Sequence, residues 1–191
     1  MSLGGSTMRR AAFFWAAGIA SLCAAVAQAQ HQPQHQPYAG LEERPIKALS
    51  EQQVADLKAG RGTGLALAAE LNGYPGPIHV LELAEPLGLT EAQRAKVQSL
   101  YEAMKAEAVP LGERLIAQEA DLERQFREQS VSAASLSRAT EAIGATQGAL
   151  RAAHLKHHLS TVEALSPDQV RRYAELRGYG GGTHRPRHGH P

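Results

Sequence analysis

Three histidines in the second half of the chain are the residues best placed to do chemistry. His154, His157 and His158 lie within five consecutive positions. If this segment is helical, His154 and His158 lie one turn apart on the same face, so that two imidazoles can bind one metal ion. Partly buried histidines satisfied by carbonyls and carboxylates are the alternative interpretation. The spacing predicts a site for a divalent transition ion such as Zn²⁺, Ni²⁺, Cu²⁺ or Co²⁺.

Two long helices must position these histidines. Apolar residues recur at steps of three and four from Val97 to Phe126, and a second such stripe runs from Leu136 to Thr161 through the histidines. The polar segment 128–133 between them indicates a turn, so the pattern predicts a long antiparallel helical hairpin. Pro110 falls inside the first helix and predicts a kink, because the stripe continues in phase beyond it.

Folding this hairpin about residue 130 predicts which side chains face the histidines. Met104 and Glu107 of the first helix then lie opposite them and offer a thioether and a carboxylate. The candidate metal ligands are therefore His154, His157, His158 and Glu107. The histidines near the chain ends either capture the same ions loosely or belong to merely soluble tails. They are His31, His35, His184, His188 and His190.

One short pattern marks three helix starts. A leucine precedes a Ser or Thr, and a Gln follows three residues later, which is a capping box with its preceding hydrophobic residue. The three copies are Leu49-Ser50-Glu51-Gln52-Gln53, Leu89-Thr90-Glu91-Ala92-Gln93 and Leu165-Ser166-Pro167-Asp168-Gln169. Short flanking helices are predicted over 50–59, about 65–71 and about 78–87, and a last helix ends near Arg177. No run alternates with period two, so the predicted fold class is all-α.

The ends of the chain differ in composition from its middle. Arg9 and Arg10 precede an apolar run and the small-residue pattern Ala27-Gln28-Ala29, which predicts a signal peptide over 1–29. The run of sixteen residues is shorter than a membrane span of roughly 20, so we expect a periplasmic protein with no membrane span after cleavage. The other predicted parts are a disordered linker over 30–48, a helical domain over 49–178, and a disordered Gly- and His-rich tail over 179–191.

Charge and cysteine content exclude several classes of function. The 20 basic and 19 acidic side chains include no basic stripe, so nucleic acid is not an expected partner. The one cysteine, Cys23, lies in the predicted signal peptide, which excludes a disulfide and a cysteine zinc site. The glycine-rich segment 60–64 lacks a phosphate-loop ending, and no nucleophile has a base positioned by periodicity, so we expect no enzyme. A hairpin poor in aromatic residues buries little area, so we expect a homodimer.

The two later capping boxes carry a resemblance to a known family. Leu89, Thr90 and Gln93 open the long helix, and Leu165, Ser166 and Gln169 open the last one, behind a signal peptide. This arrangement resembles the periplasmic LTxxQ family of Spy/CpxP-like proteins and the related heavy-metal-resistance and sensor proteins of the CnrX/ZraP type. The resemblance covers roughly residues 78–178 and implies a dimeric helical fold in the periplasm.

The resemblance implies three non-enzymatic roles. The first, which is our hypothesis, is binding of a divalent transition metal for sensing or buffering. The second is an ATP-independent chaperone, or holdase, that binds unfolded client proteins, and the apolar helical face with few aromatic residues suits it unless that face is the dimer seam. The third is an adaptor that docks on a membrane-bound stress regulator. The family's metal sensors also carry His-x-x-x-His before the hairpin, where this chain has only His79, with Leu83 four residues on.

Overall fold

The computed structural model describes residues 38–179 and confirms the all-α fold class. This part of the chain contains six helices and no strand: α1 (Glu51–Lys58), α2 (Leu67–Glu70), α3 (Pro77–Glu82), α4 (Glu91–Arg127), α5 (Ala133–Glu163) and α6 (Pro167–Leu176). The predicted signal peptide, the linker up to residue 37 and the tail from residue 180 lie outside the described residues. None of the described helices is both long enough and apolar enough to span a membrane.

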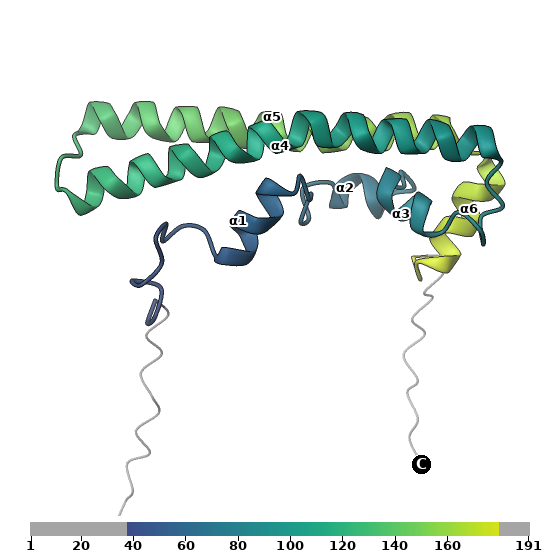
Figure 1. The fold of residues 1–191 in the computed structure, drawn as a ribbon, viewed down its shortest axis with the longest axis horizontal. Coiled ribbons are helices and arrows are strands. Elements are labelled where there is room, and N and C mark those ends of the chain that lie inside the picture. The colour runs from purple at the N-terminus through teal and green to yellow at the C-terminus, as the bar shows by residue number, and fades with distance from the viewer. Residues whose placement is uncertain (1–37, 180–191) are drawn as a thin grey trace, which may run out of the picture. The chain divides into compact units, whose positions relative to one another are not determined.

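The predicted hairpin is the largest feature of the fold. Helices α4 and α5 run antiparallel side by side and are joined by a short turn around Gln129, which adopts a left-handed φ of 53° (Figure 1). Pro110 lies inside α4, and the helix continues through it as predicted. Toward the turn, α4 diverges from α5 (Figure 1).

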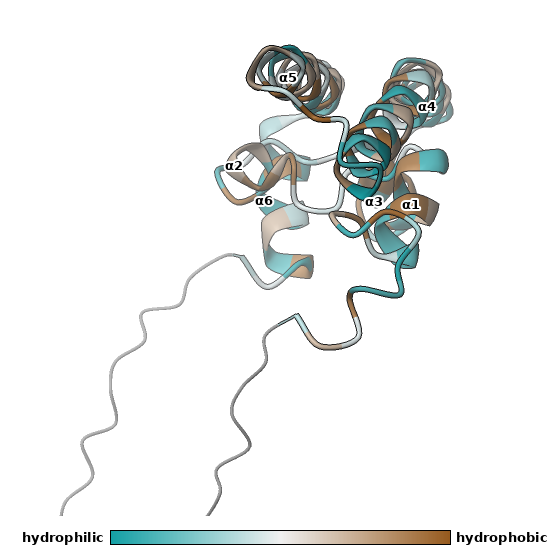
Figure 2. Cartoon of the chain, turned by 90° about the vertical axis from the view of Figure 1, so that its left-hand side faces the viewer, coloured by the Kyte–Doolittle hydropathy of each residue, from teal (hydrophilic) through white to brown (hydrophobic). Residues whose placement is uncertain are grey.

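The short helices form a second layer on one side of the hairpin. Helices α1 and α3 pack on α4, while α2 lies against α5 (Figure 2). The predicted helix over 78–87 is wrong in its second half, because α3 ends at Glu82 and turns follow it. The physical reason is Pro86, whose ring would clash with the carbonyl of Glu82 four residues earlier and which has no N–H to donate. Helix α2 is also shorter than predicted.

All three predicted capping boxes are present. In each box the hydroxyl of the Ser or Thr accepts a hydrogen bond from the backbone N–H of the Gln three positions later. The side chain of that Gln in turn accepts a hydrogen bond from the backbone N–H of the Ser or Thr. The three pairs are Ser50 with Gln53, Thr90 with Gln93, and Ser166 with Gln169. A fourth box, which sequence analysis missed, opens α5, where Ser132 and Ser135 play these roles. Serine replaces the usual Gln or Glu there, so the familiar signature is absent.

Two of the capping glutamines also bind each other. Gln93 Nε2 donates to Gln169 Oε1 at 2.8 Å, and Gln169 Nε2 donates to Gln93 Oε1 at 3.0 Å. Gln93 Nε2 further donates to the Ala164 carbonyl at 3.1 Å. The first residues of α4 and α6, 76 positions apart, are therefore fixed to one another by side-chain amides.

The apolar core divides into two clusters. One lies at the open end of the hairpin and contains Val80, Leu87, Val97, Leu165 and Tyr173. The other lies along the hairpin and contains Ala108, Leu115, Ile143 and Leu150. Near the turn, Phe126 and Leu136 are 52% and 38% exposed, so the two predicted stripes do not meet along their whole length. The divergence of α4 from α5 explains this difference.

A glycine in α4 permits the close approach of α1. A Cβ atom at Gly112 would lie 2.4 Å from the Leu57 carbonyl oxygen, whereas one at the exposed Gly148 of α5 would meet no atom within 4 Å.

We expect Gly112→Ala to lower the free energy of unfolding by about 1–2 kcal/mol. Overpacking costs up to about 3 kcal/mol, and the higher helix propensity of alanine offsets about 1 kcal/mol of this. We expect the control Gly148→Ala to raise it by roughly 0.5–1 kcal/mol. Urea denaturation of both variants measures this, and equal stabilisation would contradict the contact.

Candidate functional site

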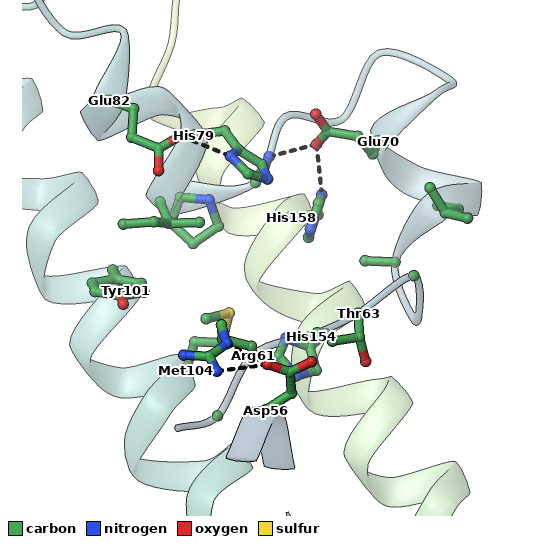
Figure 3. Close-up of a pocket in the computed structure, with 18 residues that line it drawn as sticks. Asp56, Arg61, Thr63, Glu70, His79, Glu82, Tyr101, Met104, His154 and His158 are labelled. Carbon is green, nitrogen blue, oxygen red and sulfur yellow. Dashed lines mark hydrogen bonds and ion pairs between the residues drawn. The ribbon is translucent and has the colours of Figure 1, made fainter. Parts of the chain in front are cut away.

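The three predicted histidines are buried on α5. His154, His157 and His158 are 3%, 6% and 7% exposed. His154 and His158 line a cavity of about 420 Å³ between the hairpin and the segment containing α1 to α3, with Met104 of α4 on its wall (Figure 3). The side chains predicted to share one helix face therefore do face one cavity.

His158 is held in one orientation by its backbone contact. Its Nδ1 lies 2.7 Å from the Tyr74 carbonyl oxygen, which can only accept, so Nδ1 carries a proton; in the neutral form of such a ring, Nε2 is the nitrogen with the lone pair. The chain at Gly76 covers the ring closely, because a Cβ atom there would lie 3.0 Å from Nε2. An imidazole whose Nδ1–H donates to a carbonyl is the usual arrangement of a metal-binding histidine.

His154 has a ring nitrogen without a partner. Its Nε2 is buried, and no described residue offers it a hydrogen bond. Burial lowers the pKa of His154 below its ordinary value, and the neighbouring imidazoles of His158 and His157 lower it further. Gly62 covers this ring, since a Cβ atom there would lie 3.1 Å from Nδ1. The result is a neutral imidazole, which is the form that binds metal.

His157 and Glu107 form a separate pair. His157 Nε2 lies 3.5 Å from Glu107 Oε1, and Lys156 makes an ion pair with the same carboxylate. Lys156, and then His157, hold the pKa of Glu107 below its ordinary value. Both nitrogens of His157 are buried with no hydrogen-bond partner among residues 38–179. Glu107 thus lies opposite His157, as the folding of the hairpin predicts, and Met104 lines the cavity with His154 and His158.

The predicted ligands are not gathered into one cluster. Two of them face the cavity and two form the pair toward α4. In the part of the chain that the structure describes, no three His, Cys, Asp or Glu side chains are close enough together to hold one ion. The set of four ligands stays a prediction. Of the four, His154 and His158 are the two that line the cavity.

Two buried carboxylates that the sequence patterns did not predict lie beside the histidines. Asp56 of α1 is 8% exposed and accepts hydrogen bonds from Arg61 Nε at 2.6 Å and Gln52 Nε2 at 2.8 Å. Glu70 of α2 is also 8% exposed, and its Oε2 lies 3.8 Å from His158 Nδ1 (Figure 3). Glu70 is the single charged residue in the segment 65–77, and a lone charge in an apolar segment is the signal that could have identified it.

The donor atoms on the cavity suit a transition ion. Imidazole nitrogens from α5, the thioether of Met104 and the carboxylates of Asp56 and Glu70 are of the types that Zn²⁺, Ni²⁺, Cu²⁺ and Co²⁺ accept. The unpartnered Nε2 of His154 is the observation that favours a ligand over simple packing, since buried nitrogens normally have partners. The types of donor on the cavity therefore suit such an ion, and the two imidazoles are the donors that it would bind first.

The lowered pKa of His154 predicts a pH dependence of stability. Below pH 6.5, the ordinary pKa, His154 takes up a proton in the unfolded chain but not yet in the folded chain, where its pKa is lower. The free energy of unfolding therefore falls as the pH decreases below 6.5. Above that pH, His154 is neutral in both states and makes no difference to stability. We expect a loss of at most about 1.4 kcal/mol per pH unit. Denaturation at pH 7.5 and 5.5 with EDTA should show a smaller loss for His154→Gln. The control His184→Gln should match the unsubstituted chain, and an unchanged loss in His154→Gln would contradict the assignment.

Comparison with known proteins gives one match. The model of the heavy-metal-resistance family matches residues 66–172, a range that contains both LTxxQ boxes, the hairpin and all three buried histidines. No curated protein and no solved structure matches the chain significantly. Because the match spans more than half of the chain, from α2 into α6, this protein belongs to the heavy-metal-resistance family.

Proposed function

We propose that this protein binds a divalent transition metal ion through His154 and His158 and so senses or buffers the ion in the periplasm. The observation that carries the proposal is the state of the two rings. His158 has its Nδ1–H committed to the Tyr74 carbonyl, and His154 has a buried nitrogen without a partner. Both rings face one cavity and come from one rigid helix. Membership of the heavy-metal-resistance family supports the same role.

The remaining candidate ligands lie on either side of the two rings. His157 follows His154 by three residues and is paired with the ionised carboxylate of Glu107. On the other side, Glu70 and Asp56 are buried carboxylates that would offset part of the ion's charge. A bound ion would supply only positive charge and fixed coordination here, since the role requires binding and no reaction.

The location and assembly in this proposal come from the sequence. The predicted signal peptide favours export to the periplasm. The thin core, whose two apolar clusters contain only five and four buried residues, favours a homodimer.

Metal titration tests the proposed site. Calorimetry on the chain with its five tail histidines replaced by Ala (His31, His35, His184, His188 and His190) should show micromolar or tighter binding of Zn²⁺, Ni²⁺, Cu²⁺ or Co²⁺ at a fixed stoichiometry. We expect the double substitution His154→Ala and His158→Ala to weaken binding by about 100-fold or more, because loss of outer contacts alone costs 10–100-fold.

Two control variants make this test specific. His79→Ala changes a histidine on the cavity wall that already pairs with Glu82 at 2.9 Å, and it should leave affinity within about threefold. The metal affinity of His157→Ala shows whether the His157–Glu107 pair contributes to binding in addition to the two histidines on the cavity. Equal loss in His79→Ala and in the double variant, or unchanged affinity in the double variant, would reject His154 and His158 as ligands.

A second candidate function, the holdase, is favoured by exposed leucines. Leu67, the first residue of α2, and Leu71, which directly follows its last residue, are 54% and 56% exposed, and Leu159 on the neighbouring α5 is 52% exposed. Singly exposed leucines are common on protein surfaces, but three on adjoining helices offer a shallow apolar surface for unfolded segments.

The holdase role predicts a metal-independent effect on client aggregation. In light scattering of a heat- or reductant-denatured client with EDTA present, the unsubstituted chain should suppress aggregation at a few-fold molar excess. The substitutions Leu71→Asp and Leu159→Asp should remove most of this suppression, because charge on the surface opposes apolar contact. The matched exposed change Phe126→Asp, on the far part of α4, should not. Absence of suppression by the unsubstituted chain would exclude this role.

A further inference from the structure

Glu70 lies where the histidine cavity meets the C-terminal helix. Its carboxylate is 8% exposed and is contacted from two sides. On the cavity side, Oε2 accepts a hydrogen bond from the Gly76 backbone N–H at 3.1 Å and lies 3.8 Å from His158 Nδ1. Gly76 itself covers the His158 ring. One oxygen of Glu70 is therefore part of the surroundings of His158.

The other oxygen of Glu70 binds the end of the chain. Oε1 accepts hydrogen bonds from the hydroxyl groups of Tyr173 in α6 and of Tyr179 beyond it, the latter at 3.2 Å. Arg177 Nε lies 3.7 Å from the same oxygen. Tyr173 is 2% exposed, and burial, reinforced by the Glu70 charge, raises the pKa of its hydroxyl far above the ordinary value, so that it stays a donor. Glu70 thus holds residues more than 100 positions away.

We propose that Glu70 couples occupation of the histidine cavity to the position of the C-terminal helix, so that a cation bound at His154 and His158 tightens the attachment of α6. This inference rests on the proposed function. Metal on His158 Nε2 makes its Nδ1–H a stronger donor and adds positive charge beside Glu70. A buried carboxylate with mainly neutral donors gains from that charge. This favourable interaction keeps Glu70 in the position where it accepts hydrogen bonds from Tyr173 and Tyr179.

Coupling of this kind is reciprocal. If the ion tightens α6 by some factor, weakening the hold of Glu70 on α6 must weaken ion binding by the same factor. Tyr173 is not among the residues that line the cavity, and its hydroxyl donates to Glu70, whose other oxygen lies beside His158. If Glu70 had only a structural role, substitution of Tyr173 would leave the metal affinity unchanged. A change in that affinity would therefore indicate coupling.

The experiment combines hydrogen exchange with titration. In the full chain with its five tail histidines replaced by Ala, amide exchange of residues 167–179 is measured with and without saturating Zn²⁺, and with Ni²⁺ in parallel. We expect exchange to slow about fivefold or more with metal, and we expect Glu70→Gln to abolish that slowing. We expect Tyr173→Phe to weaken Zn²⁺ binding about fivefold, while the exposed matched change Tyr38→Phe leaves it unchanged.

The outcomes separate this coupling from the proposed function. Binding of Zn²⁺ or Ni²⁺ with unchanged or faster exchange in α6, or with the same response in Glu70→Gln, would overturn the coupling and leave metal binding intact. Failure of Zn²⁺, Ni²⁺, Cu²⁺ and Co²⁺ alike to bind would overturn both the coupling and the proposed function. If Glu70→Gln does not fold, Tyr179→Phe replaces it, because Tyr179 is 37% exposed and its loss removes one hydroxyl from Glu70. An unchanged metal affinity in both tyrosine variants would then overturn the coupling.

Discussion

The constraint on which the rest of the structure depends is the burial of the Glu70 carboxylate. A charged carboxylate in the interior costs several kcal/mol unless hydrogen bonds and charges surround it. The fold meets this cost with donors from distant parts of the chain, namely the Gly76 backbone and the hydroxyl groups of Tyr173 and Tyr179. These contacts require the α2–α3 segment and α6 to meet at the open end of the hairpin. The same placement lays Gly62 and Gly76 over His154 and His158.

The histidine turn places three buried imidazoles in the interior of the hairpin. Leaving a buried polar atom without a partner costs about 1–3 kcal/mol, and the described residues leave three such ring nitrogens on His154 and His157. A chain selected only for stability would replace these imidazoles with Leu or Ala, as the rest of α5 does at Leu150 and Ala153. Retained instability of this kind is typical of functional sites, and an ion that binds only the folded chain stabilises it by linkage.

How much of this could be predicted from the sequence depends on periodicity. The hairpin and its register, including Glu107 opposite His157, followed from helical spacing because that spacing persists over eight turns or more. The starts of α1, α4 and α6 followed from capping chemistry, whereas the start of α5 did not, because Ser135 stands where the pattern has glutamine. The contacts of Glu70 did not follow, because its partner Tyr173 lies 103 positions away and the short turns around α2 and α3 carry no period. Phe126 and Leu136 were predicted to lie on the buried stripes but are exposed, because periodicity alone does not reveal where two helices diverge.

The LTxxQ boxes gain a role beyond capping from the pairing of their glutamines. Gln93 and Gln169 tie the start of α6 to the start of α4, and this bond does not involve the cavity. The far part of α6 is tied instead by Tyr173 to Glu70, beside His158. In the proposed coupling, the glutamine pair fixes α6 at its first turn, while the hold of Glu70 on Tyr173 varies with occupation of the cavity. The helix would then rotate or loosen about its first turn, and the sequence motif would form the pivot of that movement.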